Sequence, residues 1–120
     1  MKLIRLLLTL VFLLQSVSSF AAPRMWGKRG TATTSNATLT VGGSTPFQPA
    51  FVCVWNDGAA ELIFNFSGTA TTTDNVSNLT LKSTEGACYN FNYEGVVGTF
   101  QIGVITASST ALYRIHAGQK

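Results

Sequence analysis

Charged side chains are scarce in this sequence, and histidine occurs once, at His116. Among 120 residues, eight are Lys or Arg and five are Asp or Glu, which gives a net charge of +3. From Gly30 onward only three basic side chains stand against five acidic ones. A nucleic-acid-binding surface needs clustered Lys and Arg to displace counterions from phosphates. This distribution excludes nucleic acid as a partner.

No apolar run is long enough to cross a bilayer, which takes roughly 20 residues. The longest, residues 6–14, follows Lys2 and Arg5 and precedes small residues just before Ala22. This is the pattern of a secretory signal peptide. We expect residues 1–21 to be removed, which leaves one domain without a membrane span. The mature protein would then be secreted or periplasmic, or lie on a virion surface.

The segment after the expected cleavage site has no periodicity and holds half of the remaining basic side chains. We expect residues 22–30 to form a flexible basic arm. Within it, Lys28-Arg29 has the form of a dibasic processing site for a eukaryotic host. Trp26 is a candidate anchor for docking the arm on a partner.

Cysteine occurs only twice, at Cys53 and Cys88, and no CxxC motif is present. An even count in an exported chain favours a disulfide. Two buried thiols that pack as small apolar groups are the alternative. A metal site needs three or four ligands, and two cysteines with His116 are a poor set. We therefore expect neither a metal nor another cofactor.

Apolar and polar residues alternate with period two through most of the chain, and no helical period follows the leader. Such a pattern predicts about seven short strands and an antiparallel β-sandwich, or a small barrel, over residues 31–120. The predicted core consists of Leu39, Val41, Val52, Val54, Leu62, Phe64, Phe66, Leu79, Leu81, Phe91, Phe100, Ile102, Val104, Tyr113 and Ile115.

The segment 51–66 is the clearest pair of strands. Asn56-Asp57-Gly58 is a strong turn signal because these residues tolerate positive φ, so a β-hairpin is predicted here. Residues 51–55 are apolar in both phases. This predicts a central strand covered on both faces.

No residue set points to a reaction. Nucleophilic catalysis needs a base beside Ser or Cys, and His116 lies on the polar phase of the last expected strand; a surface histidine is favoured over a Cys53–His116 pair. The carboxylates Asp57, Glu61 and Glu94 fall at turns or on a polar phase, where solvation explains them better than a glycosidase pair does. We expect no catalytic residue and no enzymatic activity.

Large aromatic residues outside the predicted core are the candidate interface. Trp55, Tyr89 and Tyr93 would suit stacking against a glycan, although packing in the core or at an interface is the favoured role. The candidate interface residues are Trp26, Phe51, Trp55, Tyr89 and Tyr93.

Four Asn-x-Ser/Thr sequons are candidate glycosylation sites in a eukaryotic host only. They lie at Asn36, Asn65, Asn75 and Asn78.

Residues 54–72 (VWNDGAAELIFNFSGTATT) contain a turn, an apolar strand and a Gly/Thr-rich loop, followed by Leu79-Thr80-Leu81 and by the ending Leu112-Tyr113-Arg114-Ile115-His116-Ala117-Gly118. This order resembles the small β-sandwich decoration and fibre-like proteins of tailed bacteriophage virions. The resemblance covers about two-thirds of the chain. It implies a non-enzymatic subunit that binds a larger assembly, often as a homotrimer. An export signal and the Cys53/Cys88 pair depart from that pattern.

The sequence thus predicts an exported structural or binding module that works through a protein partner or through self-assembly. The alternative is a small secreted effector or adhesive module that binds a host protein or glycan. Fungal effectors resemble the chain in combining a leader, a possible Lys-Arg site, a β-sandwich and one disulfide.

Overall fold

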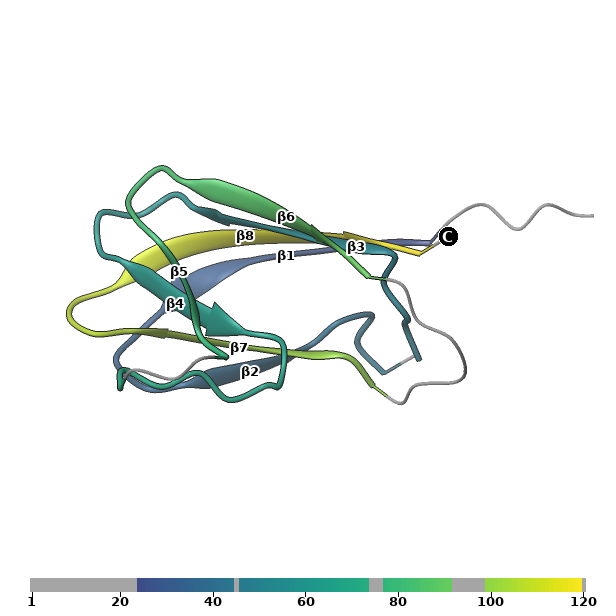
Figure 1. The fold of residues 1–120 in the computed structure, drawn as a ribbon, viewed down its shortest axis with the longest axis horizontal. Helices are drawn as coiled ribbons and strands as arrows, with labels where there is room; N and C mark the ends of the chain where they lie inside the picture. Colours follow the sequence, from purple (N-terminus) through teal and green to yellow (C-terminus); the bar gives the residue numbers. More distant parts are fainter. Residues whose placement is uncertain (1–23, 45, 74–76, 92–98, 120) are drawn as a thin grey trace, which may run out of the picture.

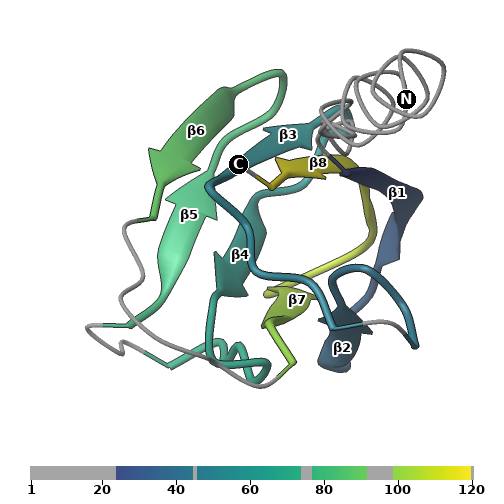
Figure 2. The ribbon, with the colours of Figure 1, turned by 90° about the vertical axis from the view of Figure 1, so that its right-hand side faces the viewer.

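A computed structural model describes residues 24–44, 46–73, 77–91 and 99–119. Within these residues the chain forms eight strands and no helix, arranged as two four-stranded antiparallel sheets packed face to face (Figure 1, Figure 2). The predicted all-β sandwich is confirmed, with one strand more than expected. The predicted signal peptide, residues 1–21, lies outside the described residues.

Each sheet has its own set of strands. Sheet A has the order β1 (Met25–Ala32), β8 (Ala111–Gly118), β3 (Phe51–Asn56) and β6 (Gly86–Asn90). Sheet B has the order β2 (Ala37–Thr40), β7 (Gln101–Thr106), β4 (Leu62–Asn65) and β5 (Leu79–Leu81). Most connections pass from one sheet to the other, and the β4–β5 connection stays within sheet B.

The inward residues of both sheets form one core. All fifteen predicted core residues either belong to the buried cluster or pack against it. The sequence pattern missed Phe47, which is only 2% exposed. Phe47 lies in a segment without strand periodicity, between Pro46 and Pro49, so alternation could not reveal it.

The predicted hairpin over residues 51–66 is wrong, because β3 belongs to sheet A and β4 to sheet B. The Asn56 side chain directs this crossing. Its amide nitrogen donates hydrogen bonds to the carbonyl oxygens of Ala60 (2.7 Å) and Leu81 (3.0 Å). Its carbonyl oxygen accepts one from the amide of Gly58 (2.9 Å). Asn56 is 1% exposed, so the turn is fixed between the two sheets.

The predicted flexible arm is also wrong for residues 25–30. These residues form most of β1, which pairs with β8 from Met25 opposite Gly118 to Ala32 opposite Ala111. The arm lacks apolar alternation because β1 carries glycines and exposed basic residues. Its extended state comes from pairing with β8 and from the half-buried Trp26, which packs against the core.

Replacing Asn56 with Ala should lower the free energy of unfolding by about 2–3 kcal/mol, because buried carbonyl groups lose their donors. Urea unfolding measures the difference. Asn90→Ala, at an exposed strand position, is the matched control and should change stability by less than about 0.5 kcal/mol. Equal losses in the two variants would contradict this role for Asn56.

Candidate docking surface

The alternation of inward and outward residues along β3 identifies the residues on the outer face of sheet A. Val52 and Val54 are fully buried between the sheets. Because neighbouring strand residues point to opposite faces, Phe51, Cys53 and Trp55 point outward. Their register partners place further side chains on the same face, namely Met25, Arg29, Asn90, Cys88, Leu112, Arg114 and His116.

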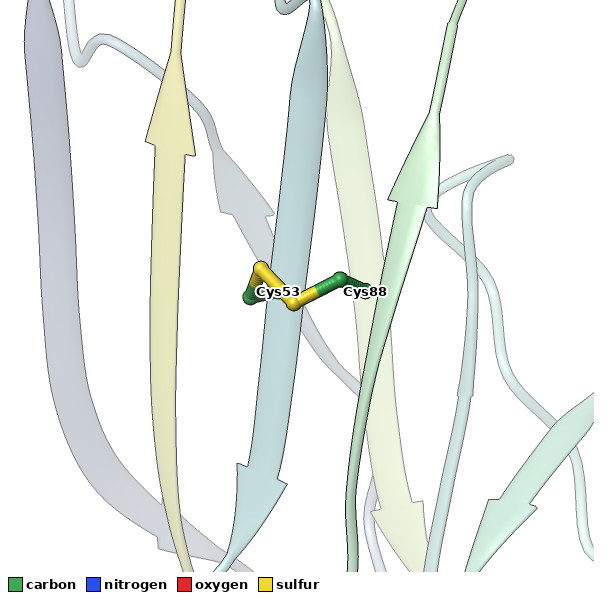
Figure 3. The surroundings of a disulfide bond; sticks show 2 residues. All are labelled: Cys53 and Cys88. Carbon is green, nitrogen blue, oxygen red and sulfur yellow. A yellow bond between two sulfur atoms is a disulfide. The ribbon is translucent and has the colours of Figure 1, made fainter.

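A disulfide crosses this face. Cys53 on β3 lies directly opposite Cys88 on β6, with their Cα atoms 4.0 Å apart and an S–S bond of 1.99 Å (Figure 3). Cys53 is 8% exposed, whereas Cys88 is exposed. The predicted disulfide is confirmed, and the alternative of two free thiols is wrong. His116 lies opposite Cys53 on β8, but Cys53 has no free thiol to serve as a nucleophile.

Trp55 is held in place by its neighbours. A Cβ atom at Gly86, its partner on β6, would collide with the indole ring, so the ring lies over a glycine. The Arg114 guanidinium carbon is 5.0 Å from the ring centroid. The His116 ring meets the indole edge to face, with 5.3 Å between centroids. The half-buried Trp55 therefore presents a packed aromatic surface.

Arg114 also binds Asp57 with two hydrogen bonds, from Nε (2.6 Å) and from a terminal nitrogen (3.1 Å). These bonds lower the pKa of the Asp57 carboxyl, the positive charges of Arg114 and Arg29 add to the effect, and burial opposes it. Asp57, in the turn that follows β3, thus contacts the outer face of sheet A through Arg114. The ion pair fixes Arg114 against Trp55.

At one end of the face, Phe51 lies over Gly118, where a Cβ atom would meet both the Phe51 ring and the Met25 sulfur. Met25 and Leu112 are the two large apolar side chains that are most exposed among the described residues, at 64% and 55%. Both lie on this face, near opposite ends. Both side chains are accessible to a partner at this face.

The outer face of sheet B differs, because a loop covers its apolar residues. Ile63 on β4 and Ile105 on β7 form a second buried cluster with Ala70 of the loop that follows β4. A Cβ atom at Gly103 would lie 2.6 Å from the Ala70 nitrogen, so the loop passes directly over β7. Ile63 thus lies on the outward phase of β4, but this loop buries it.

Of the five candidate interface residues, Phe51 and Trp55 lie on the outer face of sheet A. Trp26 and Tyr89 pack against the core instead, and burial raises the pKa of the Tyr89 hydroxyl. Tyr89 meets the rings of Phe64 and Phe66 at 6.0 and 5.2 Å. Tyr93 lies outside the described residues. Trp55 and Tyr89 point to opposite faces of sheet A, so they do not form one glycan-stacking platform.

The side chains of the sequon asparagines among the described residues form hydrogen bonds within and between loops. Asn65 is buried, and its amide donates to Thr69 and Asn78 while accepting from Ser67, so modification at Asn65 would require that loop to open. The Asn36 amide oxygen accepts the Ala70 N–H at 2.8 Å. The Asn78 amide donates to the Thr71 carbonyl at 2.7 Å. Asn75 lies outside the described residues.

Two of the three carboxylates considered from the sequence lie among the described residues. Asp57 is bound to Arg114, Glu61 is exposed in the turn before β4, and Glu94 lies outside the described residues. Over the described part of the chain, no three His, Cys, Asp or Glu side chains gather as a metal site would require. Nor does that part contain a helix with the length and apolarity needed to span a membrane. No protein-family model and no curated protein sequence matches the chain.

Replacing Arg114 with Gln should raise the pKa of Asp57 toward its ordinary value of 3.8, because the hydrogen bonds and the positive charge are lost. A lowered pKa in the folded state contributes stability above the pKa of the unfolded chain, and this contribution is lost as pH falls through the folded pKa. An NMR titration of the Asp57 carboxyl carbon measures the shift. Glu61→Gln is the control and should leave the titration unchanged; an unshifted Asp57 in the Arg114 variant would contradict the ion pair.

Proposed function

We propose that the protein is an exported, non-enzymatic binding module that attaches to a larger assembly through the outer face of sheet A. The observation that carries this proposal is the difference between the two faces of the sandwich. Sheet B buries its outer apolar residues, Ile63 and Ile105, under the loop at Ala70. Sheet A leaves Met25 and Leu112 exposed.

The contacts that fix the side chains on the outer face of sheet A favour a binding role over a catalytic one. Phe51 and Trp55 lie over glycines, Arg114 is fixed by Asp57, and a disulfide joins β3 to β6. These contacts reduce the side-chain freedom that a partner would have to restrict, and prearranged aromatic and Arg side chains are the usual anchors of interfaces. The confirmed disulfide is compatible with an extracellular protein. The resemblance to virion decoration proteins implies the same class of role.

In this proposal a second copy of the chain covers the face. Two like faces pair as a two-fold dimer, whereas a homotrimer or larger ring pairs this face with a different surface of the next copy. A face of four strands with up to eight residues each spans about 19 by 26 Å at standard strand spacing and rise. Two such faces bury about 1,000 Å² in total, which is near the lower limit for a specific interface. An interface of this size depends on its few apolar anchors.

Replacing Met25 and Leu112 together with Lys should dissociate the assembly, because a lysine ammonium is costly to desolvate at an interface. Light scattering on a sizing column measures the mass of the exported protein without reductant. We expect an oligomer for the unchanged protein and at least about tenfold weaker association for the variant.

Thr80→Lys, on the outer phase of β5 in sheet B, is the control and should leave the mass unchanged. A monomer at every concentration, or an oligomer indifferent to both substitutions, would overturn self-assembly through this face. An assembly that the Thr80 variant also dissociates would place the interface elsewhere.

A further inference from the structure

The edge of sheet A at β1 is a second feature, distinct from the docking face. β1 has eight residues, whereas the edge strands β6, β2 and β5 have five, four and three. Its partner β8 lies on one side only. Figure 2 shows β1 at the end of sheet A. Among the described strands it is the longest with an open side.

The register shows which backbone groups of β1 face that open side. The Gln119 N–H donates to the Arg24 carbonyl at 2.9 Å, so residues 24 and 119 form a hydrogen-bonded pair. Such pairs alternate with non-bonded pairs in antiparallel sheets. The N–H and C=O groups of alternate residues therefore point away from β8, namely Met25, Gly27, Arg29 and Thr31. This row of donors and acceptors is what an added strand requires.

The positive charge at this edge determines which strands can pair with β1. Lys28 and Arg29 occupy the middle of β1 and are exposed. Arg29 lies opposite Arg114 on the outer face, where Asp57 is the acidic partner of Arg114. Lys28 lies opposite the buried Ile115, on the other face of β1. An antiparallel pairing of two β1 strands about a two-fold axis at Arg29 would set this residue against Arg29 of the second copy. Like charges directly opposite each other are destabilising, and edge lysines commonly prevent such pairing.

We propose that β1 binds an extended acidic segment of a partner protein, which adds to sheet A as a fifth strand. Main-chain hydrogen bonds to the open side of β1 supply the affinity. Lys28 and Arg29 supply the selectivity, since carboxylates on the added strand relieve the positive charge at the edge. The proposal goes beyond self-assembly through the face, because that surface and this edge use different groups.

The test uses labelled peptides of the same length as β1, one alternating Val with Glu and the other Val with Lys. Fluorescence anisotropy at low salt measures their binding to the exported protein. We expect the Glu peptide to bind at least about tenfold tighter than the Lys peptide. The double variant Lys28→Glu, Arg29→Glu should reverse this order, while Thr80→Lys, which adds a charge on sheet B, should leave it unchanged.

Thr31→Pro removes one outward N–H without removing a bond to β8, because proline is tolerated on the open side of an edge strand. It should weaken the Glu peptide several-fold, whereas Thr31→Val, which keeps the N–H, should not. Thermal unfolding shows whether both variants stay folded. Equal binding of the two peptides, no binding of either, or an indifferent Thr31→Pro variant would overturn the proposal.

Discussion

The side chain of Asn56 is the contact on which the arrangement of both sheets depends. It ties the end of β3 to Ala60 and to Leu81, so that the chain leaves sheet A and enters sheet B instead of folding back beside β3. With β4 in the other sheet, β3 is free to pair with β6 on one side and β8 on the other. That pairing brings Cys53 opposite Cys88. The same turn places Asp57 beside Arg114, which in turn holds Trp55.

Alternation predicted the inward residues correctly but not the partners of the strands. Val52, Val54, Leu62 and Phe64 point inward whichever strands lie beside them, so period two suffices for the core. A turn signal such as Asn56-Asp57-Gly58 does not say whether the chain stays in its sheet. That choice depends on the buried carbonyls of Ala60 and Leu81, which the sequence pattern cannot supply. β1 was not predicted for a similar reason. It is a strand because it pairs with β8, and its own sequence has no apolar alternation.

The candidate site was predicted in part. A strand that is apolar in both phases singled out Phe51 and Trp55, and both lie on the outer face of sheet A. Tyr89 could have been assigned to the core, because the alternation that exposes Cys88 turns its neighbour inward. The difference between the faces could not be predicted. It depends on a loop that packs over Ile63 and Ile105 from outside the strands.

Among the described residues, a loop covers the outer apolar residues of sheet B, whereas the outer face of sheet A and the open side of β1 are not covered. Amide hydrogen exchange of the purified protein alone, followed by NMR, tests this claim most directly. The account predicts slow exchange at Trp26, Lys28 and Ala32, whose N–H groups face β8, and fast exchange at Gly27, Arg29 and Thr31. Uniformly fast exchange across residues 25–32 would mean that β1 is not a strand. Uniformly slow exchange would mean that its edge is already covered.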